Sequence, residues 1–178
     1  MTEEKRTRIR KIMFPLYFVI AAAVVGVDQL TKYLVLKNLT SVSTVPLIKN
    51  VLHLTYVENR GAAFGMLSNS RWVFMIVSSA VIVIMTAYLI INRRGAVLGN
   101  IAVSFVLGGG IGNMIDRIWR GYVVDFIDFR LINFYVFNAA DSFVCVGCGL
   151  LIFVLIKNEL AARKAKKNRA PESDGDGR

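Results

Sequence analysis

The chain has 178 residues, of which 55% are hydrophobic, and a formal net charge of +10. A soluble domain has an apolar share of roughly 45–50% even with glycine included, so the surplus here must face lipid or another chain. A strong positive charge can indicate nucleic acid, but only when basic residues are interleaved over a folded surface. Here the charges lie apart from the apolar runs, so we expect an integral membrane protein and no nucleic-acid partner.

Four long apolar runs follow one another along the chain, and the last is interrupted only by Asp141. Two of the runs have 21 residues without a charge. At about 1.5 Å per residue such a helix is about 30 Å long, which matches the hydrocarbon core of a bilayer. The sequence therefore predicts an all-α membrane protein, with the first helix able to continue toward Leu36 and the four helices at about residues 12–30, 71–92, 96–115 and 137–157.

The segments between the helices are too short to fold as independent domains. They span about residues 31–70 and 116–136, so residues 12–158 are expected to form a single membrane domain. Two stretches in them, 51–57 and 122–129, are rich in β-branched and aromatic residues and predict strands. We expect a small β-sheet or cradle resting on the extracytoplasmic surface of the membrane, with a short outer loop between the third and fourth helices.

Basic residues predict the orientation in the membrane. Of the 22 lysines and arginines, 14 lie in the head at residues 1–11, in the turn Arg93–Arg94, or after residue 156. The positive-inside rule then places both termini in the cytoplasm. Residues 159–178, which are basic and then acidic, predict a disordered cytoplasmic tail.

An alternative for the first segment is a cleavable signal peptide, because basic residues precede an apolar run that ends in Ala21–Ala23. Cleavage would leave three helices, and the remaining charges would fit the topology less well.

Asp141 is the most informative residue, since a carboxylate within an apolar run is costly and indicates function. It shares a helix face with polar and small residues at steps of three and four: Asn138, Ser142, Cys145 and Gly149. The third helix carries a matching stripe at steps of four, which predicts close helix packing: Ser104, Gly108, Gly112 and Asp116.

The polar residues of three helices fall at the same end. Asp28 closes the first helix, Asn113, Asp116 and Arg117 close the third, and Asn138 with Asp141 opens the fourth. Because transporters bind their substrates near the midplane, this depth favours a site for a substrate embedded in the outer leaflet.

Carboxylate chemistry is the reaction type that remains after histidine, cysteine and phosphate-loop sites are considered. The single histidine, His53, is expected at the surface of a strand, and Cys145 and Cys148 are expected to be small packing residues. The glycines of 108–112 lack the strand and lysine of a phosphate loop. Two aspartates that share a proton can act as base and acid toward water, and Asp141 could pair with Asp125 or Asp116.

Two other function classes use the same residues. A lipid-headgroup transferase could hold Mg²⁺ with four aspartates: Asp116, Asp125, Asp128 and Asp141. A proton-coupled transporter could use Asp141 as its carrier group, provided that Asp141 lies near the middle of the bilayer.

Five motifs in order resemble the sequence blocks of the lipoprotein signal peptidase (signal peptidase II) family. They are Asp28-Gln29-Leu30-Thr31-Lys32, Asn59-Arg60-Gly61-Ala62-Ala63-Phe64-Gly65, Gly108 to Arg117, Val123-Val124-Asp125-Phe126 and Phe137-Asn138-Ala139-Ala140-Asp141-Ser142. Each block alone is weakly specific, but five in order on a four-helix membrane chain are highly specific.

The resemblance implies an intramembrane aspartic endopeptidase that cuts prolipoprotein signal peptides before the diacylglyceryl-modified cysteine. It implies Asp125 and Asp141 as the catalytic pair, with Gly61 to Gly65 in the outer cradle. The residues that it implies around the pair and the substrate are Asp28, Asn59, Gly61, Asn113, Arg117 and Asn138. It also implies a bacterial cytoplasmic (inner) membrane location, no cofactor or metal, and lipid-modified prolipoproteins and membrane lipid as partners. From the topology we expect the active site at the outer leaflet, and we expect a monomer.

Overall fold

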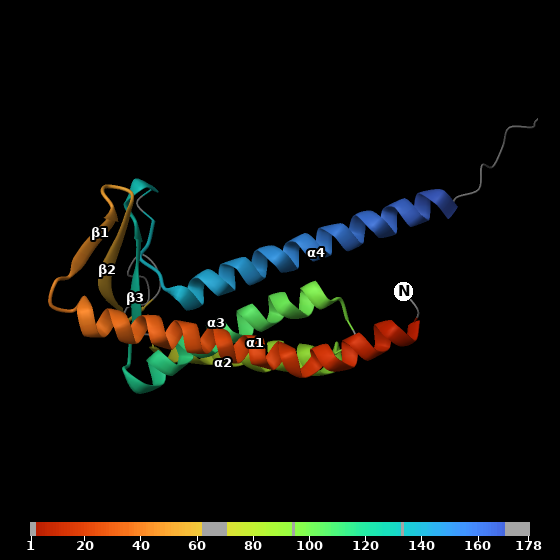
Figure 1. The fold of residues 1–178 in the computed structure, drawn as a ribbon, viewed down its shortest axis with the longest axis horizontal. Helices are drawn as coiled ribbons and strands as arrows, with labels where there is room; N and C mark the ends of the chain where they lie inside the picture. The colour runs from red at the N-terminus through yellow and green to blue at the C-terminus, as the bar shows by residue number, and fades with distance from the viewer. Residues whose placement is uncertain (1–2, 62–70, 94, 133, 170–178) are drawn as a thin grey trace, which may run out of the picture.

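The computed structural model describes residues 3–61, 71–93, 95–132 and 134–169. Four α-helices and a three-stranded sheet occur in the order α1 (Glu3–Asn38), β1 (Thr44–Ile48), β2 (Leu52–Asn59), α2 (Arg71–Ile91), α3 (Val97–Trp119), β3 (Val123–Phe129), a 3₁₀ turn at Arg130–Ile132 and α4 (Ala139–Arg169). All four helices are long and apolar enough to cross a membrane, which confirms the four predicted helices. The sheet lies at one end of the helices, and the N-terminus and the far end of α4 lie toward the other (Figure 1).

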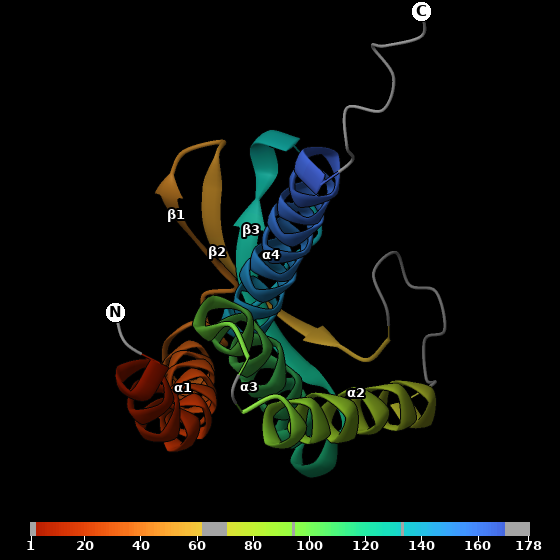
Figure 2. The same ribbon diagram turned by 90° about the vertical axis from the view of Figure 1, so that its right-hand side faces the viewer.

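Helix α3 is the centre of the bundle, with α1, α2 and α4 arranged around it (Figure 2). In the apolar 18-residue stretch of α3, 61% of the residues are buried inside the protein. The corresponding shares in α1, α2 and α4 are 22%, 6% and 11%. One core cluster joins α1, α2 and α3 through Tyr17, Ala21, Leu89, Val103 and Leu107. The outer helices therefore present mostly apolar side chains to their surroundings, as lipid-facing helices do.

Glycines on α3 allow this close packing. A Cβ built on Gly108 would lie 2.6 Å from the carbonyl oxygen of Ala21 on α1. On the next residue, Gly109, it would lie 2.5 Å from the carbonyl oxygen of Ala140 on α4. The predicted close approach at the glycine stripe is confirmed, because backbone atoms of both neighbours occupy the space that a side chain would need.

The sheet is antiparallel in the order β1-β2-β3. Strands β2 and β3 match the two predicted strands, whereas β1 was not predicted. Asn59 pairs with Val123, and Val57 pairs with Asp125, so the end of β2 lies beside the start of β3. The sheet packs on the C-terminal end of α1 through a second apolar cluster that includes Val35, Leu39, Val124 and Phe126.

Both terminal helices are longer than expected. Helix α1 spans Glu3–Asn38, so it begins before the predicted residue 12 and ends two residues after Leu36, toward which the sequence allowed it to continue. Lys32, a charge within this helix, is fully buried in ion pairs. Helix α4 continues to Arg169, so residues 159–169 are helical and not disordered. This stretch is rich in good helix formers and carries a Glu159–Arg163 pair at 2.8 Å. The rest of the predicted tail, 170–178, lies outside the described residues.

His53 is buried, with only 7% of its surface exposed, so the expectation of a surface histidine was wrong. It lies on the central strand β2, where it is paired with Pro46 of β1 and Asp128 of β3. Flanking strands on both sides cover a residue that an isolated strand would have exposed.

Gly147 and Gly149 provide a matched test of the helix packing, because both lie on α4. A Cβ on Gly147 would lie 2.7 Å from the carbonyl oxygen of Ala102 on α3, whereas one on Gly149 meets nothing within 4 Å. We expect Gly147→Ala to destabilise the protein by about 1–3 kcal/mol through overpacking. Gly149→Ala should be neutral or stabilise it by up to about 1 kcal/mol, because alanine favours helix. Thermal unfolding in detergent measures both, and equal stability of the two variants would contradict the close approach.

Candidate active site

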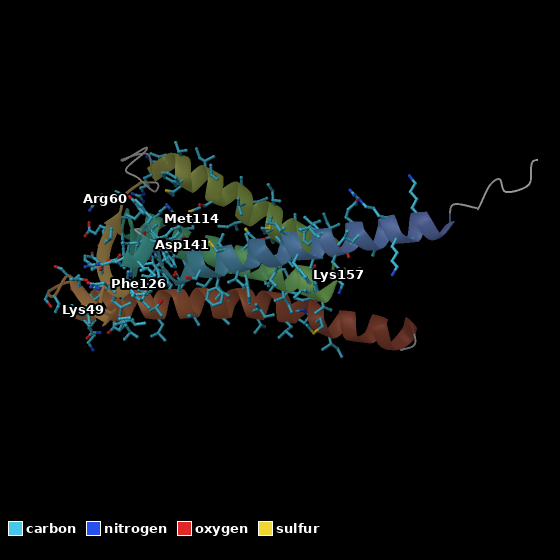
Figure 3. The ribbon with its side chains drawn as sticks, turned by 90° about the horizontal axis from the view of Figure 1, so that it is seen from above. Lys49, Arg60, Met114, Phe126, Asp141 and Lys157 are labelled. Atoms are coloured by element: carbon cyan, nitrogen blue, oxygen red, sulfur yellow. The ribbon has the colours of Figure 1, made fainter. Side chains whose placement is uncertain are left out.

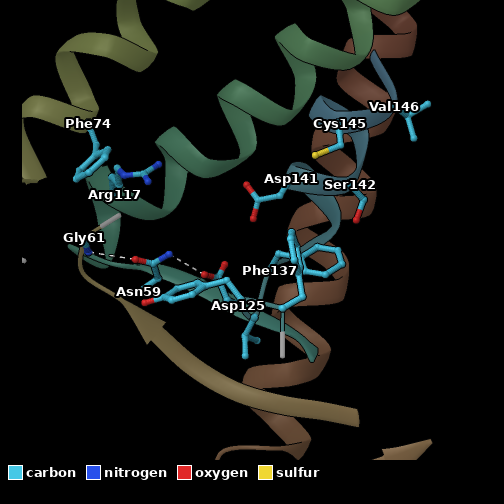
Figure 4. Close-up of a pocket in the computed structure, with 13 residues that line it drawn as sticks. Asn59, Gly61, Phe74, Arg117, Asp125, Phe137, Asp141, Ser142, Cys145 and Val146 are labelled. Carbon is cyan, nitrogen blue, oxygen red and sulfur yellow. Dashed lines mark hydrogen bonds between the residues drawn. The ribbon is translucent and has the colours of Figure 1, made fainter. Parts of the chain in front are cut away.

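A pocket of about 570 Å³ opens at the sheet end of the helices, and Asp125 and Asp141 lie on its wall. The two carboxylates point toward one another from β3 and from the first turn of α4 (Figure 4). Asp141 lies close to the sheet, while Lys157 lies toward the opposite end of the same helix (Figure 3). The remaining wall is mainly apolar and includes Phe74, Phe134, Val136, Phe137 and Val146.

Two amides hold the carboxylate of Asp125, which is only 1% exposed. Asn59 Nδ2 donates to Oδ2 at 2.8 Å, and Asn138 Nδ2 donates to Oδ1 at 2.6 Å. The Gly61 N–H donates to Asn59 Oδ1 at 3.1 Å, which turns the amide nitrogen of Asn59 toward Asp125. The pKa of Asp125 is raised to about 7, chiefly by burial and also by the charge of Asp141, while the two amides and the charge of Lys32 oppose the shift.

Asp141 is fixed by the start of α4. The Asp141 N–H donates to Asn138 Oδ1 at 3.0 Å, and the Asn138 N–H donates to Asp141 Oδ2 at 3.2 Å. This reciprocal pair is a capping box in which Asn138 caps the helix and Asp141 occupies its third position. The Asn-Ala-Ala-Asp spacing was therefore a helix-start signal as well as part of a polar face.

Arg117 of α3 lines the polar side of the pocket, and Asn113 of the same helix contacts Asp141 without lining the pocket. Asn113 Nδ2 donates to Asp141 Oδ1 at 2.7 Å. Arg117 Nη1 donates to the carbonyl oxygen of Asn113 at 3.2 Å, and its guanidinium lies 5.4 Å from the centre of the Phe74 ring. Among the described lining residues, Arg117 is the one with a positive charge.

Asp28 and Asp116 lie outside the pocket wall, in a fully buried cluster around Lys32. Lys32 Nζ lies 2.8 Å from Asp28 Oδ2 and 3.1 Å from Asp116 Oδ2. Asp28 Oδ1 also accepts the Ala140 N–H at 3.0 Å, which joins α1 to the start of α4. The sequence left Asp125 and Asp116 as candidates for the carboxylate that pairs with Asp141. Asp125 lines the same pocket as Asp141, whereas Asp116 forms ion pairs with Lys32 and Arg120.

The other two function classes fit this arrangement poorly. Asp128 faces Thr55 and Arg130, at 2.7 Å and 2.9 Å, and does not line the pocket. Within the described ranges, no three acidic, histidine or cysteine side chains lie close enough together to hold a metal ion. Asp141 lies in the first turn of its helix, not near the middle as a midplane carrier would.

Lys32 received no role from the sequence, although it lies within one of the quoted motifs. The available signal was a lysine four residues after Asp28 in an apolar helix, which is the spacing of a helical ion pair. The cradle residues 62–65 lie outside the described residues, so only Gly61 of that predicted segment is placed.

Comparisons with known proteins agree with the fold and the motifs. The family model described as Signal peptidase (SPase) II matches residues 20–157. The lipoprotein signal peptidase of Clostridioides difficile (strain 630) is 49% identical over 141 residues, which are 79% of this chain and 95% of that protein. The lipoprotein signal peptidase of Brevibacillus brevis is 42% identical over 153 residues, which are 86% of this chain and 99% of that protein.

Two solved structures of bacterial membrane enzymes are similar to the whole fold. The one determined by the in meso method at 2.3 Å has a TM-score of 0.74 and 30% identity, and the match covers 91% of this chain and 95% of that one. The one at 1.9 Å has a TM-score of 0.73 and 33% identity, with coverage of 80% and 94%. On the family model and these relatives, the chain belongs to the signal peptidase II family.

Proposed function

We propose that this chain is an intramembrane aspartic endopeptidase that removes signal peptides from bacterial prolipoproteins, cutting before the diacylglyceryl-modified cysteine. The observation that carries the proposal is the pair Asp125 and Asp141, which face one another across a mainly apolar pocket. Family membership supports the peptidase and its prolipoprotein substrates.

In this mechanism a water between the two carboxylates attacks the scissile carbonyl. One aspartate, ionised, takes a proton from the water, while the other, protonated, donates its proton to the developing oxyanion or the leaving amine. The raised pKa of Asp125, about 7, suits a pair that carries one proton at neutral pH. Such proton transfers usually supply about 10²–10⁴-fold of rate, and no cofactor is needed.

The other polar residues orient the substrate and the carboxylates. Asn59 and Arg117 line the pocket and can donate to peptide carbonyls, while Asn113 and Asn138 hold the carboxylates from behind. Asp28 fixes the start of α4 through the Ala140 N–H. Aromatic and aliphatic side chains of the wall provide an apolar surface for a lipid-modified peptide.

The proposed orientation has both termini in the cytoplasm of a bacterium and the pocket at the outer leaflet of its cytoplasmic membrane. The sheet lies at one end of the helices, opposite the N-terminus and the end of α4 (Figure 1). The basic head, the turn after α2 and the end of α4 would then all lie on the cytoplasmic side, as the positive-inside rule requires. We propose that the chain acts as a monomer.

Asp125→Asn and Asp141→Asn should each lower the cleavage rate by at least about 10²–10⁴-fold, because each removes one proton-transfer group. Asp128→Asn is the matched control on the same strand: its carboxylate binds Thr55 and Arg130 and does not line the pocket. Gel-based cleavage of a lipid-modified precursor by purified protein measures all three. Turnover retained in either dyad variant would contradict the proposal.

The pH dependence follows from the raised pKa of Asp125. Its protonated form is half populated at about pH 7 and decreases tenfold for each further pH unit. We therefore expect kcat/KM to decrease as the pH rises above about 7, with an apparent pKa that belongs to the pair. Initial rates from pH 5 to pH 9 measure this, and a rate that still increases above pH 8 would be inconsistent with a protonated aspartate.

Substrate class can be tested with a diacylglyceryl-modified precursor and its unmodified twin. We expect cleavage of the modified form alone, because the apolar pocket wall is available to the lipid. A chelator should leave the rate unchanged, whereas a Mg²⁺-dependent transferase would lose activity. Equal cleavage of the twins would refute the substrate class, and loss of activity with the chelator would refute the dyad mechanism.

A further inference from the structure

Lys32 lies at the centre of a buried hydrogen-bond cluster directly behind the carboxylate pair. Its side chain and those of Asp28 and Asp116 are 0% exposed. Lys32 Nζ contacts Asp28 Oδ2 at 2.8 Å, Asp116 Oδ2 at 3.1 Å and Asn113 Oδ1 at 2.9 Å. An ammonium group has three protons to donate, and here three acceptors from two helices match them.

The contact with Lys32 helps to fix the orientation of the Asn113 amide. Because an ammonium group only donates, the Asn113 atom facing Lys32 has to be the oxygen. The amide nitrogen is thereby turned to Asp141 Oδ1, at 2.7 Å. A reversed amide would place its oxygen against the carboxylate and its nitrogen against the ammonium group, and would lose the hydrogen bonds to both.

The same oxygen also connects Lys32 to the second carboxylate. Asn113 Oδ1 accepts a further hydrogen bond from Asn138 Nδ2 at 3.0 Å, and that nitrogen also donates to Asp125 Oδ1 at 2.6 Å. Two asparagine amides therefore separate Lys32 from Asp125 and Asp141 and join it to both.

We propose that Lys32 is a positioning residue for the carboxylate pair, which fixes the amide of Asn113 and, through it, the orientation of Asp141. The inference rests on the proposed function and extends it to a residue outside the pocket wall. The charged groups that face this region come from α1, α3, α4 and β3: Asp28, Asp116, Arg117, Arg120, Asp141 and Asp125. Arg120 Nη1 lies 2.5 Å from Asp116 Oδ1, so the two cations Lys32 and Arg120 balance Asp28 and Asp116.

Lys32→Met tests the proposal, because methionine keeps much of the side-chain length and removes both the charge and the donor. Lys37→Met is the matched control on the same helix, at an exposed position. In purified, folded protein we expect kcat for a lipid-modified precursor to decrease by about 10²-fold in Lys32→Met, the effect of a misplaced catalytic group, with KM unchanged. Lys37→Met should retain the wild-type kcat.

A second readout separates positioning from a merely structural role. The positive charge of Lys32 lowers the pKa of Asp125, so its removal should shift the titration of Asp125 to higher pH. Infrared titration of the carboxyl groups in substrate-free protein measures this shift. Folded Lys32→Met with a wild-type kcat and titration overturns the proposal, even if its unfolding temperature is lower.

A charge-balanced variant covers the case in which Lys32→Met does not fold. Lys32→Met/Asp28→Asn removes one buried cation together with one buried anion, and it is compared with Asp28→Asn alone. We expect kcat of the double variant to be about 10²-fold below that of the single variant, since only the double variant loses the Asn113 contact. Equal kcat and equal titration in the two would overturn the proposal.

Failure of the proposed function is distinguishable from failure of this inference. Wild-type protein that leaves the lipid-modified precursor intact would refute the peptidase assignment. The infrared titration of Asp125 and Asp141 needs no substrate, so a shift in Lys32→Met would still support the connection, and an unchanged titration would refute it.

Discussion

The buried ion cluster around Lys32 is the interaction on which the rest of the site depends. Asp28 contacts Lys32 with one oxygen and the Ala140 N–H with the other, while Asp116 contacts Lys32 and accepts the Val124 N–H at 3.1 Å. The cluster thus joins α1, α3, β3 and α4 at the point where the chain changes from helices to sheet. Loss of one partner from a buried ion pair typically costs about 3–5 kcal/mol, because the other charge is left in an apolar environment.

Glycine packing and the ion cluster act on the same helices. Gly108 and Gly109 bring the backbones of α1 and α4 against α3, and Gly112 leaves room for the Asp28 carboxylate, which a Cβ would meet at 2.5 Å. Apolar surfaces alone drive little association between helices in lipid, so close packing and internal polar contacts have to supply the specificity. Helix α3 carries both, and this explains why it is the most buried of the four.

The sequence was sufficient for the four helices, two of the three strands and the glycine stripe, because each depends on a local pattern of residue types. The pairing of β1 was not predictable, since Thr44–Ile48 contains a proline and its side chains are mostly exposed. The burial of His53 depends on strands that lie elsewhere in the sequence. The choice between Asp116 and Asp125 as the neighbour of Asp141 depended on where Lys32 lies in space, which spacing alone could not determine.

Neutral amides donate hydrogen bonds to both carboxylates of the pair, and this has a chemical consequence. In the described part of the chain, neither Lys32 nor Arg117 forms an ion pair with Asp125 or Asp141. A cation in direct contact would stabilise an ionised carboxylate and hinder the sharing of one proton. Here Lys32 binds the side-chain oxygen of Asn113, and Arg117 binds its backbone oxygen, so each cation acts from one residue away. Amide donors fix the orientation of both carboxylates without a neighbouring cation, and this arrangement suits the proton sharing that the proposed acid–base chemistry on a water molecule requires.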